Sequence, residues 1–458
     1  MTYIKRYTPD FSRRTFLANT AKGLLRAGVL CSAWDAFAKS GSIEAAYPDE
    51  LLSLDEFTKG LISAGSEINQ DNVEYVKELL NPVCYMQIKE MGRRLKIAPT
   101  TLDIFKLSPY EYIEATLRNA GQAQFDKSGN VVSASGEPWI GGNPFPKPTS
   151  GIELFAAHTL SWGRHDVSFY ATEQYDLNPE GDIQYEYTSC WAEMSASGRL
   201  VLNPKPFWGS KEDKLRYQSV FFLNPSDSRG IAYLNIWPYD QRKFPDLYGY
   251  LPAFKRVRRF PTNQRFEPLV AGSQLYLSDA WGAGDPYMTW GNYRIIDRRP
   301  MLAAVSDGWD SASENWKHQS HGGAKDNMFW DTTVELIPEV IVVEAEPVMF
   351  PRAPISKKRV WFDARTALPI AMLSYDRQGK PFRFFDGAYS LYEDGENKVM
   401  DGKHPYWAWT TMHAFNVQTH RMTRIEQVEA VRGGHRMRVN DESVYSKYLT
   451  LSSLQRLG

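Results

Sequence analysis

The sequence has few cysteines and no excess of charge of either sign. Its 458 residues include 3 cysteines, too few for a disulfide framework or for a zinc site with four thiolates. The 53 basic and 54 acidic residues give a formal net charge of -1, which argues against a protein that binds nucleic acid over its whole surface. Beyond residue 38 there is no run of about 18 apolar residues, so no transmembrane helix is predicted there.

Sequence signatures of several enzyme classes are also missing. The chain contains no G-x-S-x-G nucleophile elbow, no H-E-x-x-H zinc motif, no P-loop and no dinucleotide-binding fingerprint. No repeat of fixed period occurs. We therefore predict no cofactor, and the sequence favours a binding protein over an enzyme without deciding between them.

The N-terminus resembles an export signal of the twin-arginine type. Residues 12–17 read SRRTFL, a weakly apolar stretch follows to residue 34, and Ala36-Phe37-Ala38 matches the small-x-small pattern that signal peptidase cuts. We predict cleavage after Ala38 and a soluble periplasmic protein. The alternative is an amphipathic N-terminal helix in a cytosolic protein. Cys31 does not fit a lipidation site, because the preceding Leu30 is not small.

Two cysteines remain after the predicted cleavage, Cys84 and Cys190. In an oxidising compartment they could form one disulfide. They could equally be two buried thiols, since a free cysteine is often buried as a small apolar residue. The sequence leaves both alternatives open.

Helical periodicity is confined to the first third of the chain. Apolar residues at helical spacing predict helices over residues 51–62, 72–95 and 109–120. Pro82 interrupts the second of these, so we expect a break or a kink there. A Pro- and Gly-rich segment at residues 141–148 then leads into the rest of the chain.

From Asp166 onward the sequence is typical of strands joined by short turns. Residues 183–187 (IQYEY) show the β-forming pattern, and residues 178–181 (NPEG) are a typical turn. We predict an α+β protein in which a strongly curved antiparallel sheet, a half-barrel, wraps around helices. The predicted divisions are a signal peptide (1–38), a helical lead-in (39–150) and a curved β domain (151–458), the last two forming one structural unit.

Five segments carry a resemblance to a known family. Residues 248–261 read YGYLPAFKRVRRFP, and weaker motifs follow the family's order at residues 136–142, 340–346, 356–363 and 373–379. Together they resemble the domain-of-unknown-function family 1329 (DUF1329), periplasmic relatives of the LolA/LolB-like outer-membrane lipoprotein-sorting proteins. The resemblance covers most of residues 130–400. It implies a LolA/LolB-like half-barrel with an apolar cavity between sheet and helices, which holds acyl chains in related carriers.

The resemblance also implies a function. It suggests a periplasmic carrier or chaperone that binds a lipid or another hydrophobic small molecule. Family members are often encoded beside RND-type (resistance-nodulation) exporters, which implies an inner-membrane exporter and an outer-membrane protein as partners. No enzymatic activity or cofactor is implied. A third possibility is an accessory subunit of an exporter that binds no ligand.

The candidate ligand-binding residues are aromatic or basic and lie in or near the segment that carries the resemblance. This segment resembles a strand with charged side chains on both of its faces, so neither face belongs to a dry core. One face could line the water-filled mouth of a cavity, where guanidinium groups would bind an anionic head group. The alternative is a charged edge strand that discourages aggregation. The predicted site residues are Tyr248, Tyr250, Phe254, Arg256, Arg258, Trp237 and Trp290.

A metal site is the competing chemical hypothesis. His318 and His321 are three residues apart and could share a metal with Asp326 or Asp331 in an exported metal-dependent hydrolase. No third histidine lies near them in the sequence, and the segment has the composition of a solvated loop. We therefore predict neither catalytic residues nor a metal, and keep the His318/His321 loop as the alternative.

Overall fold

The computed structural model describes residues 30–209, 213–261, 265–279, 284–307, 309–310, 313–393 and 405–457. The twin-arginine motif at residues 12–17 lies outside them. The helices are α3 (Ala33–Ser40), α4 (Leu54–Thr58), α5 (Pro82–Met91), α6 (Tyr110–Arg118), α7 (Gly151–Leu160), α8 (Ser443–Tyr448) and α9 (Leu451–Leu457). Short 3-10 helices lie at Glu44–Ala46, Asp49–Leu51, Val73–Leu79, Ile104–Lys106, Pro252–Phe254, Tyr287–Thr289, Glu314–Trp316, Ala324–Asp326 and Arg432–Gly434. No helix in these ranges is long and apolar enough to cross a membrane.

One sheet of 17 strands organises the protein. Its antiparallel order is β10 (Arg256–Phe260), β9 (Asp246–Leu251), β8 (Ala232–Pro238), β7 (Lys214–Asn224), β6 (Ile183–Ser195), β5 (Val167–Leu177), β20 (Met422–Val428), β19 (Trp407–Asn416), β18 (Pro381–Glu393), β17 (Leu368–Asp376), β16 (Ile355–Asp363), β15 (Thr333–Glu346) and β11 (Gly291–Ala303). Four short strands join it: β1 (Glu67–Ile68), β2 (Leu95–Ile97), β12 (Trp309–Asp310) and β23 (Arg438–Val439). Separate pairs are β3 (Gln124–Phe125) with β4 (Val131–Val132), β13 (Ser320–His321) with β14 (Phe329–Trp330), and β21 (Ala430–Val431) with β22 (His435–Arg436).

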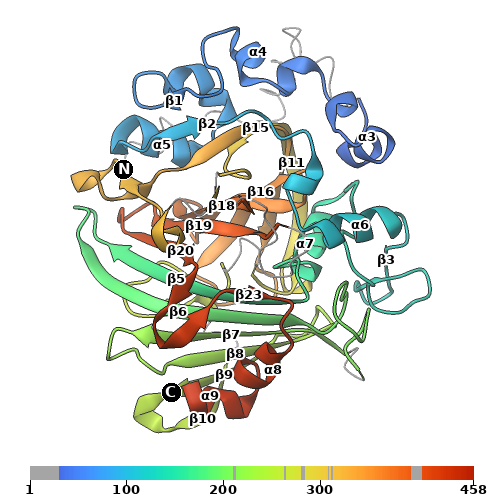
Figure 1. The fold of residues 1–458 in the computed structure, drawn as a ribbon, viewed down its shortest axis with the longest axis vertical. Coiled ribbons are helices and arrows are strands. Elements are labelled where there is room, and N and C mark those ends of the chain that lie inside the picture. Colours follow the sequence, from blue (N-terminus) through green and yellow to red (C-terminus); the bar gives the residue numbers. More distant parts are fainter. Residues whose placement is uncertain are drawn as a thin grey trace.

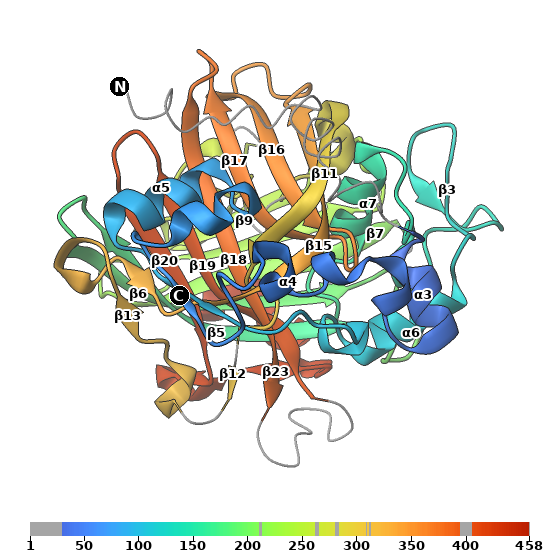
Figure 2. The same ribbon diagram turned by 90° about the horizontal axis from the view of Figure 1, so that it is seen from above.

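The sheet is strongly curved and open. Within the described residues β10 pairs only with β9 and β11 only with β15, so these two strands are its edges. Helices α3, α4 and α5 lie at one end of the molecule and α8 and α9 at the other, with the sheet between them (Figure 1). Seen from above, α4 and α5 lie in front of the sheet strands (Figure 2). The predicted α+β class with a curved antiparallel sheet around helices is confirmed.

The helical lead-in follows the sequence pattern in part. The second predicted helix divides as expected, into a 3-10 helix at Val73–Leu79 and α5, which begins at Pro82. Proline suits this first position because its missing N–H has no partner in the first helical turn. Helix α6 begins directly after Pro109, whereas the helix expected over residues 51–62 is reduced to α4.

Helices α7, α8 and α9 are not among the helices that the sequence periodicity predicts. Helix α7 is buried on almost every side, including Leu154, Phe155, Ala156 and Ala157. A helix that is apolar all round shows no amphipathic period, which is why the pattern missed it. Its start is marked by a capping box between Ser150 and Glu153.

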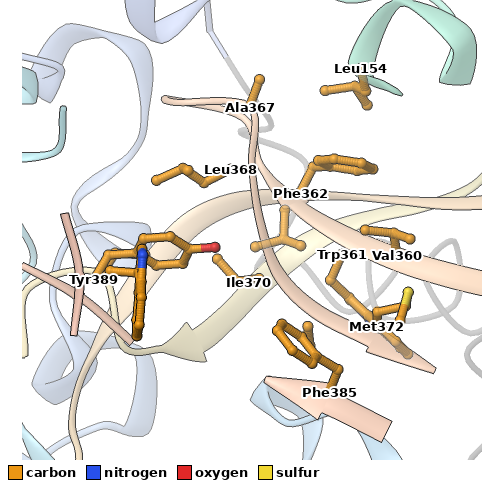
Figure 3. Packing of buried hydrophobic residues seen from close by; sticks show 14 of the residues in the cluster. Leu154, Val360, Trp361, Phe362, Ala367, Leu368, Ile370, Met372, Phe385 and Tyr389 are labelled. Atoms are coloured by element: carbon orange, nitrogen blue, oxygen red, sulfur yellow. The ribbon is translucent and has the colours of Figure 1, made fainter. Parts of the chain in front are cut away.

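Helix α7 fills the inside of the curved sheet. The Phe155 ring packs edge-on against Phe362 of β16, with ring centres 5.2 Å apart. Figure 3 shows Leu154 of α7 beside the apolar side chains of β16, β17 and β18. The apolar cavity expected from the family resemblance is therefore largely filled around α7 by packed side chains, and two small cavities remain at the C-terminal end of this helix.

The opposite face of strands β5 to β9 is covered by the C-terminal helices. Because successive side chains of a strand point to opposite faces, Tyr170 belongs to the inner core while Phe169 packs on Tyr448 of α8, with ring centres 4.7 Å apart. Cys190 lies in this outer cluster and Cys84 in the cluster around α5. Both are free thiols, so the alternative of two buried thiols is confirmed.

Between the edge strands β10 and β11, the chain passes over the sheet from one half to the other. Within residues 265–279, the carbonyl of Ala271 accepts a hydrogen bond from Tyr187 of β6, and Asp279 forms an ion pair with Arg383 of β18. The crossing segment, residues 265–279, thus connects the two halves of the sheet and reaches the free space beside α7.

Candidate ligand-binding site at the end of helix α7

Two small cavities flank the C-terminal end of α7. The first, which we call the α7 cavity, has a volume of about 40 Å³ and lies between α7, strands β6, β7 and β8, and the crossing segment. The second has a volume of about 30 Å³ and lies against β17, β18 and β19. His158, Trp162 and Tyr170 line both cavities, so they separate one from the other. Each cavity has room for a few water molecules or one small polar group.

Aromatic rings make up much of the wall of both cavities. Trp162, Tyr170, Trp191 and Trp237 line the α7 cavity, and Trp407 and Trp409 line the second. Such rings offer apolar faces and polar edges to a ligand.

The α7 cavity also contains buried polar atoms that have no hydrogen-bond partner in the protein. A polar atom that loses water without gaining a partner costs about 1–3 kcal/mol, so a site with several of them favours a polar ligand group or bound water. These atoms are Thr159 Oγ1, Glu193 Oε1, Arg216 Nε, Asn235 Oδ1 and Trp237 Nε1.

Glu193 and Arg216 determine the charge of the α7 cavity. Burial raises the pKa of Glu193 to about 8, although Arg216 and a hydrogen bond from Gln218 oppose the shift. Burial also lowers the pKa of Arg216 to about 10, against the attraction of Glu193. At neutral pH the carboxyl is therefore mostly protonated and the guanidinium charged, which makes the cavity positive.

A chain of contacts joins Arg216 to two further buried cations, Arg265 and Lys358. The guanidinium carbons of Arg216 and Arg265 lie 4.4 Å and 5.7 Å from the centre of the Trp237 ring, distances typical of cation–π contacts. Arg265 forms an ion pair with Asp285, which accepts a hydrogen bond of 2.9 Å from Trp290 Nε1. Lys358 Nζ lies 3.7 Å from the centre of the Trp290 ring, and burial lowers the pKa of Lys358 to about 8.

The structure separates the predicted ligand-binding residues into two groups. Trp237 lines the α7 cavity, and Trp290 reaches it through Asp285 and Arg265. The other five lie on β9, on β10 or between them, at the outer edge of the sheet: Tyr248, Tyr250, Phe254, Arg256 and Arg258.

The edge residues do not face the cavity. Tyr248 and Tyr250 pack on the outer cluster that α8 and α9 cover. The Phe254 side chain is 49% exposed, and the Arg258 guanidinium lies 4.1 Å from the centre of its ring. Arg256 is exposed. Their position agrees with the alternative of a charged edge strand, which discourages pairing with another sheet.

Sequence reasoning missed Glu193, Arg216 and Asn235. They occupy alternate, inward-facing positions of otherwise apolar strands, next to inward-facing aromatics such as Trp191 and Trp237. The sequence did contain a signal for these residues, namely a charged residue at a position where the strand pattern is otherwise apolar. A charged group is rare in a protein core unless it has a partner or a ligand.

The two histidines of the metal hypothesis have separate partners. His318 lies between Asp307 and Glu426, with nitrogen–oxygen distances of 3.5 Å and 3.7 Å. His321 Nδ1 lies 2.7 Å from Asp331, and its Nε2 accepts a hydrogen bond from the backbone N–H of Arg94. No group of three or more His, Cys, Asp or Glu side chains able to hold a metal occurs in the part of the chain that the structure describes.

His318 is expected to stabilise the protein in its protonated form. Burial disfavours the charge, but the nearby carboxylates of Asp307 and Glu426 outweigh burial and raise the pKa of His318 from 6.5 to about 9. The stabilisation is thus complete below about pH 6.5 and is lost as the pH rises through about 9. We expect His318→Gln to lower the free energy of unfolding by about 1–3 kcal/mol at pH 6, measured by urea denaturation.

The same measurement at pH 10 should show a much smaller difference between His318→Gln and the wild type. In an Asp307→Asn background the effect of the substitution at pH 6 should also shrink, because one of the two carboxylates is gone. An effect of equal size at both pH values would contradict this role for the imidazolium.

Comparison with known proteins gives one family and several related structures. The sequence model of the family described as "Protein of unknown function (DUF1329)" matches residues 67–455. No curated protein matches the chain. A DUF1329 family protein from Desulfovibrio piger is 16% identical, with a TM-score of 0.43, over 66% of this chain and 97% of that one.

Two further solved structures are similar in part. An outer membrane lipoprotein-sorting protein domain from Vibrio parahaemolyticus is 19% identical, with a TM-score of 0.42, over 67% of this chain and 98% of that one. A LolA superfamily protein from Nitrosomonas europaea is 12% identical, with a TM-score of 0.35, over 65% of this chain and 98% of that one.

Proposed function

The chain belongs to the DUF1329 family, and from this premise we propose that it is a periplasmic carrier for a hydrophobic compound. The ligand would bind at the C-terminal end of α7. The observation that carries the proposal is the α7 cavity itself, in which indole rings and unpartnered buried polar atoms line the same space. This combination suits a molecule with an apolar body and one polar group.

The energetics fit a carrier. Each CH₂ group of a ligand that leaves water for an apolar wall contributes about 0.8 kcal/mol. The two cavities are small beside ligand pockets of about 300–1,000 Å³, so we propose that ligand entry joins them. The joining would require His158, Trp162 and Tyr170 to move, because these three side chains separate the cavities.

Protein purified from its own periplasm is expected to carry about one equivalent of an organic compound. Native mass spectrometry with organic extraction and metal analysis of the same sample would measure it. Trp237→Ala should lower the affinity for the compound about tenfold, which corresponds to about 1.4 kcal/mol of lost contact, and so reduce the bound fraction. Phe254→Ala is the matched control, since this aromatic side chain lies at the exposed sheet edge.

Other outcomes would point elsewhere. One equivalent of zinc, copper or iron without an organic compound would replace the carrier with the exported metal-dependent hydrolase and direct attention to His318 and His321. Loss of the compound in Phe254→Ala but not in Trp237→Ala would move the site to the edge strand.

Export and partners form the finer part of the proposal. The SRRTFL motif supports export by the twin-arginine route, and the family resemblance supports work beside an RND-type exporter and an outer-membrane protein. A pull-down from detergent-solubilised membranes tests these partners. An exporter complex formed equally well by a protein without bound compound would favour an accessory subunit over a carrier.

A further inference from the structure

Glu193 and Arg216 both line the α7 cavity. They lie on the neighbouring strands β6 and β7, on the face of the sheet that α7 covers. Both side chains are more than nine-tenths buried, and Glu193 Oε1 and Arg216 Nε have no hydrogen-bond partner in the protein. The Arg216 guanidinium therefore keeps a free donor that points to an acceptor from outside the chain.

We propose that the ligand carries an anionic group, a carboxylate or a phosphate, that binds Arg216, and that Glu193 holds a proton while the ligand is bound. This inference rests on the proposed carrier function and names the ligand class of the same site. Guanidinium forms its strongest hydrogen bonds with such oxyanions. A second negative charge in the same small cavity is unfavourable, so the anion and the Glu193 carboxylate would exclude each other.

Other groups face Glu193 from the surrounding elements. They are His158 of α7, Tyr170 of β5, Arg216 and Gln218 of β7, Arg265 of the crossing segment, and Tyr406 before β19. Burial raises the pKa of Tyr170 and of Tyr406 well above its ordinary value, so neither phenol ionises near neutral pH. Lys358, whose charge acts on Arg265, also titrates near pH 8. Its loss of charge would lower the affinity for an anion as well, and substitution of Glu193 separates this effect from that of Glu193.

The expected pH dependence follows from the exchange of charge. Below about pH 8 Glu193 is already protonated in the free protein, so the affinity for an anion does not change. Above that pH the binding of each anion requires Glu193 to take up one proton from the solvent, and the affinity falls about tenfold between pH 7 and pH 9.

The probe is dansylaminoundecanoic acid, a fluorescent fatty acid, with its uncharged amide for comparison. The full mature chain should bind the acid at least about tenfold more tightly than the amide at pH 7. Arg216→Gln should remove this preference, and Arg216→Lys should restore part of it. Glu193→Gln should lose most of the fall in affinity between pH 7 and pH 9, and the part that remains is the contribution of Lys358. Arg258→Gln, on the exposed edge strand, is the matched control and should behave like the wild type.

Competition of the bound acid by oleate or by lysophosphatidic acid distinguishes a carboxylate from a phosphate ligand. Equal binding of acid and amide, with no effect of Arg216→Gln, would overturn the anion proposal and leave the carrier intact. Binding of neither probe, in a protein that is also free of organic compound after purification, would overturn the carrier itself. A fall in affinity at pH 9 that is as large in Glu193→Gln as in the wild type would overturn the role of Glu193.

Discussion

Replacement of Arg365 by methionine is expected to lower the free energy of unfolding by about 3–5 kcal/mol. The Arg365 side chain is fully buried and forms ion pairs with two equally buried carboxylates, Glu335 at 2.8 Å and Asp363 at 2.9 Å. Burial opposes its charge, yet the two carboxylates raise the pKa of Arg365 above its ordinary value. Without the guanidinium both acids remain buried without a counter-charge, which is the costly case for a buried ion pair.

Arg365 also joins the helical lead-in to the sheet. It lies between β16 and β17 and donates a hydrogen bond of 3.0 Å to the carbonyl of Thr101, and Glu335 accepts a hydrogen bond of 2.6 Å from the Thr101 hydroxyl. Loss of Arg365 should therefore loosen the lead-in as well as the sheet. Urea denaturation followed by tryptophan fluorescence measures the change.

Two control variants make the Arg365 result specific. Lys325→Met breaks an exposed ion pair with Asp182 and should cost less than about 1 kcal/mol. The triple variant Arg365→Met, Glu335→Gln, Asp363→Asn should recover much of the stability, because no buried charge is left alone. A triple variant as unstable as Arg365→Met would mean that packing, rather than uncompensated charge, is responsible.

A protein that begins at Lys39 is expected to be less stable than one that begins at Ser32 by about 5 kcal/mol or more. The deleted residues contain Trp34 and Phe37, which are 4% and 5% exposed, and removing a buried aromatic side chain costs about 3–5 kcal/mol. Phe37 packs edge-on against Phe105 with ring centres 5.1 Å apart, and Asp35 forms an ion pair of 2.5 Å with Lys147. Urea denaturation of the two proteins tests the difference.

This packing bears on the expected cleavage after Ala38, which falls inside α3. The twin-arginine route exports folded proteins, and a peptidase needs an extended, accessible chain. We therefore expect the exported protein to keep α3 and to be cut before Ser32, whose hydroxyl accepts a hydrogen bond from the backbone N–H of Trp34. The intact mass of the protein purified from the periplasm distinguishes cleavage before Ser32 from cleavage after Ala38. A mature chain that starts at Lys39 would contradict the expectation and support the small-x-small site.

The family and the sheet could be predicted from the sequence because both depend on local patterns. The motifs at residues 248–261 and 356–363 are each a continuous stretch of sequence. The alternation of side chains along β5 and β6 follows from strand geometry. The break before α5 could be predicted for the same reason, since Pro82 occupies the first position of that helix, directly after the cap residue Asn81. Helix α7 could not, because a helix buried on all sides has no polar face to reveal its period.

The binding site depended on contacts that no local pattern contains. Glu193, Arg216, Trp237 and Arg265 come from four segments and meet only because the sheet curves around α7 and the chain crosses between its edge strands. The sequence did contain the basic strand at Arg256–Phe260, but which side of the sheet it faces depends on the pairing of β9 with β10 and on the covering helices α8 and α9. Composition and periodicity thus determine which segments become strands, whereas burial, and with it the pKa of Glu193 and the free donor of Arg216, arises only when distant segments pack together and exclude water.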